Sequence, residues 1–268
     1  SSFTGLTQIA EDGGAIHISN CGLEINNSYF KNCVSNIGGG GAIYFRNSIT
    51  LYTNNFILSN IEFIGCKSVY GGALYVYSIS KKSNVSILFC SFSSNENLQR
   101  ESFNIYNLYG GSSIFLTSRI AIILNCTFNN NKGDGGSFKI YGIFEKNEKD
   151  VLFISPFEDD DEKSILIMNC SFKDEDKSKN SIYFVNKIKG STVEIINCSF
   201  NGTLNDGSFY IDGSLLDKNA SKIFIKTCVF EDETKIAGNQ NIIDKLWLIN
   251  AQKILNQLCK KLILAVIA

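Results

Sequence analysis

Proline and histidine are almost missing from this chain of 268 residues, which contains one of each. A proline removes a backbone donor from a β-ladder, so a chain with only Pro156 leaves long stretches in which a ladder can continue without a break. The single histidine, His17, and the lack of any Cys-x-x-Cys sequence argue against a zinc site. We therefore expect no metal ion and no cofactor.

An excess of charge of one sign is also missing, since 25 Lys and Arg residues nearly balance 26 Asp and Glu residues, for a net charge of −1. A protein that binds nucleic acid usually shows a basic excess, so we expect no nucleic-acid partner. The sequence has no initiator Met, no signal peptide and no complete membrane-spanning run. Because it starts in mid-repeat at Phe3, we expect it to be a piece of a longer protein.

Two short sequence motifs, which we call the two phrases, recur along the chain at intervals of roughly 30 residues, a period typical of solenoids. The first occupies Asn125–Phe128, Asn169–Phe172 and Asn197–Phe200, with looser copies at Phe89–Phe92 and Thr227–Phe230. The second is Gly-Gly-Ala followed by an aliphatic residue, at Gly13–Ile16, Gly40–Ile43 and Gly71–Leu74. Short alternating apolar runs between Gly, Asn, Asp and Ser predict strands and turns. We therefore predict an all-β parallel β-helix of about seven to eight coils over residues 1–238.

The alternation within each repeat assigns side chains to faces. In the strand after each Gly-Gly, every second residue is mostly aliphatic, and we place these residues inside. The Cys and Phe of the first phrase should also point inside. The residues that alternate with them include Lys139, whose charge is costly to bury in a hydrophobic core. We therefore expect the column that these residues form, with one residue per repeat, to point outward. Its aromatic members form our candidate binding site, and they are Tyr44, Tyr75, Phe115, Tyr183 and Tyr210.

Five of the nine cysteines share one position of the repeat: Cys90, Cys126, Cys170, Cys198 and Cys228. Neighbours in such a column lie ~4.8 Å apart, whereas a disulfide needs Cβ atoms about 3.8 Å apart. We interpret these residues as unpaired thiols that pack as small hydrophobes.

The composition changes after Gly238. An approximate helical stripe of apolar residues predicts an amphipathic or capping helix over residues 239–268, and the stripe consists of Ile242, Leu246, Ile249, Ile254, Leu258 and Leu262. The final residues Leu262–Ala268 are all apolar. They are too few for a membrane span of about 20 residues, but they are compatible with the start of a truncated membrane anchor.

The two phrases together resemble the polymorphic outer membrane protein repeat family, whose repeats carry Gly-Gly-Ala-(Ile/Leu/Val) and Phe-x-x-Asn. The second motif appears here as Phe92–Asn95 and Phe128–Asn131. The resemblance implies a right-handed, single-stranded parallel β-helix of the pectin-lyase-like type, secreted or displayed on a cell surface and associated with adhesion. Later units depart from the pattern, as at Gly136-Ser137-Phe138, and the family provides no catalytic residues to transfer.

Three functions follow as hypotheses. The first is a non-catalytic extracellular or cell-surface scaffold that binds a protein or glycan partner through the aromatic column. The second is a polysaccharide lyase or glycoside hydrolase, for which Asp12, Asp134 and Asp206 precede equivalent turns, although Asp is also a common turn former. The third is a passive spacer. We interpret the acidic run Glu158–Glu162 as a solvated loop rather than a Ca²⁺ site.

Overall fold

The computed structural model describes residues 1–9, 11–80, 82–98, 111–132, 138–141, 163–173, 182–185, 191–201, 209–212, 222–230, 236–238 and 247–249. Every regular element in these ranges is a β-strand, and every ladder between them is parallel. The described part of the chain includes no helix that could cross a membrane. The predicted all-β class with parallel strands is therefore confirmed, and the arrangement is compatible with a parallel β-helix.

The largest sheet has 14 strands in two rows that merge at its N-terminal end. There, β4 (Leu23–Lys31) and β7 (Phe56–Ile64) are long enough to belong to both rows, and β1 (Ser2–Thr4) pairs with β4. The first row continues with β10 (Val85–Leu88), β14 (Ile120–Leu124), β17 (Lys163–Met168), β20 (Ser191–Ile196), β23 (Lys222–Lys226) and β26 (Trp247–Ile249). The second row continues with β11 (Ser91–Ser93), β15 (Thr127–Asn129), β18 (Ser171–Lys173), β21 (Ser199–Asn201) and β24 (Val229–Phe230).

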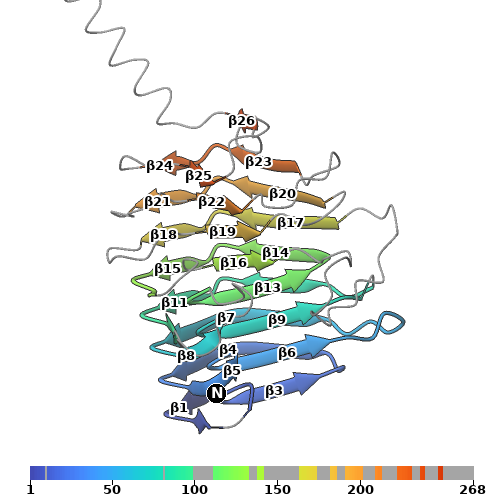
Figure 1. Cartoon of the computed structure of the whole chain (residues 1–268), viewed down its shortest axis with the longest axis vertical. Helices are drawn as coiled ribbons and strands as arrows, with labels where there is room; N and C mark the ends of the chain where they lie inside the picture. Colours follow the sequence, from blue (N-terminus) through green and yellow to red (C-terminus); the bar gives the residue numbers. More distant parts are fainter. Residues whose placement is uncertain are drawn as a thin grey trace, which may run out of the picture.

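Two smaller sheets complete the stack seen in Figure 1, in which the colours run in order from one end to the other. An eight-stranded sheet contains β3 (Ile16–Ser19), β6 (Ile43–Asn47), β9 (Leu74–Ser78), β13 (Ile114–Ser118), β16 (Phe138–Tyr141), β19 (Ile182–Val185), β22 (Phe209–Asp212) and β25 (Ile236–Gly238). A four-stranded sheet contains β2 (Thr7–Gln8), β5 (Val34–Gly39), β8 (Lys67–Tyr70) and β12 (Glu96–Asn97).

Each step along the stack corresponds to one sequence repeat. The shared phenylalanines pair in register and their rings stack, as for Phe92 on Phe128 at 4.9 Å between centroids and Phe128 on Phe172 at 4.7 Å. Phe92, Phe128 and Phe172 are at most 1% exposed. The predicted inward position of this phenylalanine is confirmed.

The turn residues of both phrases have the left-handed backbone that turns require. Asn125, Asn169 and Asn197 have φ values of 52°, 54° and 53°, which asparagine tolerates better than most residues. The first glycine of the Gly-Gly pair also has positive φ, 65° at Gly40 and 61° at Gly71. Glycine adopts positive φ without the steric cost of a Cβ, which explains its place in this motif.

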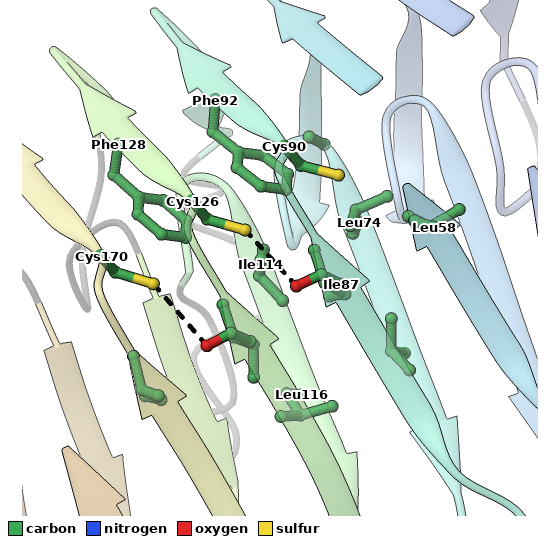
Figure 2. Close-up of a cluster of buried hydrophobic side chains, with 14 of the residues drawn as sticks. Leu58, Leu74, Ile87, Cys90, Phe92, Ile114, Leu116, Cys126, Phe128 and Cys170 are labelled. Carbon is green, nitrogen blue, oxygen red and sulfur yellow. Dashed lines mark hydrogen bonds between the residues drawn. The ribbon is translucent and has the colours of Figure 1, made fainter. Parts of the chain in front are cut away.

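The repeated cysteines point into the core beside the phenylalanines (Figure 2). Each of the eight described cysteines is free, and all except Cys21 are buried. The thiols donate to backbone carbonyl groups of the preceding repeat, as from Cys126 Sγ to Ile87 O at 3.5 Å and from Cys170 Sγ to Ile123 O at 3.7 Å. The interpretation of these residues as unpaired core thiols is confirmed.

The C-terminal helix predicted over residues 239–268 has no support in the described residues. In that range the structure describes only Trp247–Ile249, which form strand β26 and pair with β23. The rest of the range, including the apolar run Leu262–Ala268, lies outside the described residues, as does the acidic run Glu158–Glu162.

Candidate functional site

The aromatic column forms the register that the sequence predicts, on the eight-stranded sheet. Tyr44 pairs with Tyr75 and Tyr75 with Phe115, and their rings stack at 4.7 Å and 5.1 Å between centroids. Tyr183 and Tyr210 continue the column in strand register beyond Lys139. The side chains of Tyr183 and Tyr210 lie outside the described residues.

The expectation that this column is exposed is wrong where side chains are described. Tyr44 is 7% and Phe115 5% exposed, and Tyr75 is half-buried. The backbone leading into the Gly-Gly turn covers the column, since a Cβ at Gly39 would lie 2.7 Å from the Tyr75 ring. The Tyr70 ring also packs edge-on against Tyr75 and Phe115, at 6.5 Å and 6.2 Å. The column is a second packing layer and offers little surface to a ligand.

Burial also changes the acidity of these tyrosines. Burial, with a further contribution from the Asp12 carboxylate, raises the pKa of Tyr44 to about 12. Burial raises the pKa of Tyr75 as well, and the neighbouring Tyr44 adds to the effect. Both phenols therefore stay neutral near neutral pH and act as packing groups, not as acids or bases.

Asp12, the first of the three aspartates considered for catalysis, accepts a hydrogen bond from the backbone. Its Oδ1 accepts a hydrogen bond of 2.6 Å from the backbone N–H of Gly39 in the next repeat. The other two aspartates, Asp134 and Asp206, lie outside the described residues. Within the ranges that the structure describes, no three His, Cys, Asp or Glu side chains gather where they could hold a metal ion.

A more accessible surface lies on the first row of the 14-stranded sheet. Along its strands, side chains point alternately to the inner and the outer side of the sheet. On the inner side, Val85, Ile87 and Ile123 are at most 1% exposed. Large apolar side chains also occur on the outer side in four successive strands, β10, β14, β17 and β20, together with the polar outward residues Ser86 and Glu194. We call these six residues the apolar face: Leu88, Ile122, Leu124, Leu166, Met168 and Ile196.

Strand register arranges the apolar face in two columns. Leu88, Leu124, Met168 and Ile196 pair in succession, and beside them Ile122 pairs with Leu166. Ile122 is 38% exposed and the other five are half-buried, as expected for side chains flanked by neighbours on an uncovered sheet. In the column of Ile122 and Leu166, the next strands on either side carry Ser86 and Glu194, and Ile57 and Phe224 follow beyond them.

An unusual phenylalanine borders this face. Phe89 is 55% exposed and has φ of 54°, at the corner where the neighbouring repeats have Asn60 and Asn125. A bulky residue in the left-handed region is a rare and strained arrangement. Residues of this kind persist where the surrounding structure holds them in place, and they cluster at functional sites.

The second row of the same sheet is polar where the first is apolar. From β11 to β21, the outward residues beside the shared phenylalanine are Ser91, Thr127, Ser171 and Ser199. The hydroxyl groups of Ser199 and Ser171 lie 3.1 Å apart in a hydrogen bond. The apolar face is therefore a bounded patch on one half of the sheet.

The chain matches no family model, no curated protein and no solved structure. The resemblance to the polymorphic outer membrane protein repeats therefore rests on the two phrases alone, and the site must be judged on its own geometry.

The sequence interpretation missed the apolar face, although a signal was present. Residues Ile120–Leu124 and Ile165–Met168 are continuous apolar runs, without the polar residue that alternation places on a solvent-facing side. Continuous runs are typical of strands with both faces covered. A run of this kind on the outside of a stack predicts a binding surface.

Proposed function

We propose that the chain is a right-handed, single-stranded parallel β-helix of about seven to eight coils, outside the cell or on its surface. It acts as a non-catalytic scaffold in adhesion and binds a protein partner through the apolar face. The resemblance to the polymorphic outer membrane protein repeats supports the surface location and the handedness. The parallel ladders and the one-repeat register support the β-helix.

The observation that carries the binding proposal is the patch of six large apolar side chains on the outside of the stack, beside the Glu194–Lys226 ion pair. Soluble monomers rarely leave such contiguous apolar surface uncovered unless it binds something. A protein suits this surface better than a glycan does. Glycans are held by hydrogen-bonding groups and aromatic faces, and the described aromatic column that could have stacked on a sugar is largely covered.

Bead adhesion under flow tests this function. Beads coated with the chain are passed over cultured cells, some displaying the same chain and some not, and retention is counted. We expect retention that is lost with Ile122→Glu, which places a charge in the centre of the apolar face. Retention should survive Thr127→Glu, a matched control on an exposed residue of the adjacent polar row in the same repeat.

Protease treatment of the cells should abolish retention. Equal retention of both variants, or retention on protease-treated cells, would rule out a protein partner at this face.

A further inference from the structure

We infer that the chain docks on a phospholipid bilayer through the loop between β6 and β7, residues 48–55, which we call the tip loop. Leu51 and Tyr52 are neighbours in this loop, and they are 74% and 64% exposed. In Figure 1 the loop projects from the stack at the end of β6. This site is separate from the proposed function, because the tip loop shares no residue with the apolar face.

A buried polar network holds the tip loop in place. Ser80 Oγ donates to the carbonyl oxygen of Tyr52 at 2.9 Å, and Ser83 Oγ accepts from the backbone N–H of Asn54 at 2.8 Å. Asn47 joins these contacts, since its Nδ2 donates to Ser83 Oγ and its Oδ1 accepts from Asn54 Nδ2, both at 3.1 Å. Asn47, Ser80 and Ser83 are at most 1% exposed. The fold therefore presents the two exposed side chains on an ordered backbone, which lowers the cost of ordering on binding.

Basic residues flank the tip loop. Exposed Lys82 lies in the next repeat, and its backbone N–H donates to Ser80 Oγ at 3.2 Å, the same oxygen that bonds to Tyr52. Arg46 is also exposed, and its Nε donates to Ser48 Oγ at 3.1 Å where the loop begins. Lysine and arginine side chains near a membrane surface are attracted to anionic headgroups.

Acids are scarce in this part of the chain. Residues 25–95 contain five Lys and Arg residues and one acid, which lies near the far end of β7. Two further acids lie nearer to the loop, Glu24 in register with the start of β7 and Asp12 near Arg46. Within the described residues, no carboxylate pairs with Lys82. The charge of Lys82 is therefore available to a lipid phosphate or carboxylate group.

The small size of the tip favours a bilayer over a protein as its partner. A specific protein interface needs about 800 Å² from each partner, more than two side chains supply. A bilayer needs no matching surface, and binding at its headgroup boundary increases with the apolar area buried there and with attraction to anionic lipids. Tyrosine is enriched at this boundary in membrane proteins. Each contact is weak, and several copies on one surface would strengthen it through multivalency.

Co-sedimentation with vesicles tests the site. Vesicles of equal parts phosphatidylcholine and phosphatidylserine are mixed with the whole chain, and the bound fraction is measured. We expect binding that Leu51→Glu weakens by more than about fivefold, because a charge is costly to place in a bilayer. Ile9→Glu should bind as the parent chain does, since Ile9 is similarly exposed, at 71%, but follows β2. A parent chain that binds no vesicles, or equal binding by the two variants, would overturn the site.

Salt dependence tests the role of the basic residues. Lys82→Glu should weaken vesicle binding at low salt, and the effect should shrink at high salt, where exposed charges are screened. Lys31→Glu makes the same change of charge on an exposed residue at the end of β4 and should have a much smaller effect. Vesicles of phosphatidylcholine alone should bind the parent chain more weakly. Equal weakening by the two variants would mean that overall charge, and not the tip loop, attracts the chain to the vesicles.

Tryptophan fluorescence reports whether the tip enters the bilayer. Trp247→Phe removes the single tryptophan of the chain, and Tyr52→Trp or Ile9→Trp then introduces one at a chosen position. On vesicles, the emission of Tyr52→Trp should shift to the blue and be quenched by brominated lipids, while that of Ile9→Trp should do neither. If Tyr52→Trp binds vesicles without either change, docking through the tip loop is wrong.

Ile122→Glu separates the tip loop from the apolar face. It should leave vesicle binding unchanged, and the opposite pattern, in which Ile122→Glu removes binding and Leu51→Glu does not, would move lipid binding to the apolar face and overturn the tip loop. Because a lipid contact would survive protease treatment, the bead test of the proposed function is also run with chains that carry Leu51→Glu. In those chains a loss of bead retention counts against the apolar face alone, whereas a failure of the vesicle test counts against the tip loop alone.

Discussion

The side-chain oxygen of Asn131 accepts two hydrogen bonds from Asn95, one from the backbone N–H at 3.0 Å and one from Nδ2 at 3.1 Å. Asn95 repeats the pattern toward the preceding repeat. Its Oδ1 accepts from the backbone N–H of Cys66 at 2.9 Å, and its Nδ2 donates to the carbonyl oxygen of Phe63 at 3.1 Å. The two amides are at most 1% exposed. The Asn of the Phe-x-x-Asn motif therefore links three repeats through buried polar groups.

Replacing Asn95 with Ala should destabilise the fold by roughly 2–4 kcal/mol, because each buried group that loses its partner costs about 1–3 kcal/mol. The Cys66 N–H loses its acceptor, and Asn131 loses one of its two donors. Denaturant unfolding followed by circular dichroism measures the loss. Asn84→Ala provides the control, since Asn84 is exposed and its side chain lies outside this ladder. Equal unfolding midpoints for the two variants would contradict a stabilising role for the ladder.

The Gly-Gly phrase makes a second prediction, which concerns backbone geometry. Gly71 has φ of 61°, and a Cβ at this position would collide with the Leu74 carbonyl group and lie 2.9 Å from the Phe115 nitrogen. Gly71→Ala should therefore lower the free energy of unfolding by more than about 2 kcal/mol. At Gly22 the nearest atom to an added Cβ is Asn55 O at 3.5 Å, an ordinary contact. Gly22→Ala should leave the thermal midpoint nearly unchanged, and a comparable drop for both variants would refute the steric argument.

The repeat predicted the stack, because side chains such as Phe128 and Cys126 recur at one period and local alternation turns them inward. The burial of Tyr75 could not be predicted in the same way. Its outward direction follows from alternation, but the backbone of the preceding repeat covers it, since a Cβ at Gly39 would lie 2.7 Å from its ring. Ile249 fits a helical stripe and a strand equally well, and its pairing with Lys226 more than 20 residues away decides for the strand. Non-local contacts, which a single sequence does not display, account for these differences.

The covered tyrosines predict a loss of stability in alkali. Tyrosine in an unfolded chain has a pKa of about 10, whereas burial raises the pKa of Tyr44 to about 12 and also raises that of Tyr75. A raised pKa in the folded state contributes stability below the unfolded value, and this stability is lost as the pH rises through the folded value. The urea midpoint should therefore be constant up to about pH 10 and fall between about pH 10 and 12.

A pair of variants assigns this alkaline loss to the column. Tyr75→Phe keeps the stacked ring and removes the hydroxyl, so it should reduce the decrease of the urea midpoint above pH 10. Tyr52→Phe removes the hydroxyl from a residue that is 64% exposed and should leave the decrease unchanged. Absorbance of the phenolate during the same titration reports when the buried groups ionise. Identical pH profiles for the two variants would show that the column does not cause the loss.

The phenylalanine ladder should depend on every ring in it, and Phe128→Ala is the sharpest test. Phe128 is 1% exposed and stacks between Phe92 and Phe172 with interplanar angles of 4° and 3°. Its removal should cost roughly 3–5 kcal/mol, because burial is lost and a cavity remains between two rings that cannot close over it. Thr127→Ala, on the adjacent exposed residue, should cost little.

Benzene distinguishes a preserved cavity from a general collapse of the stack at this position. An apolar cavity of ring size stays dry and binds benzene, and a ligand that binds only the folded state raises the thermal midpoint. Benzene should therefore raise the midpoint of Phe128→Ala and leave that of the parent chain unchanged. If benzene raises neither midpoint while Phe128→Ala is still strongly destabilised, the neighbouring repeats have closed together, and the ladder is less rigid than its ring spacing indicates.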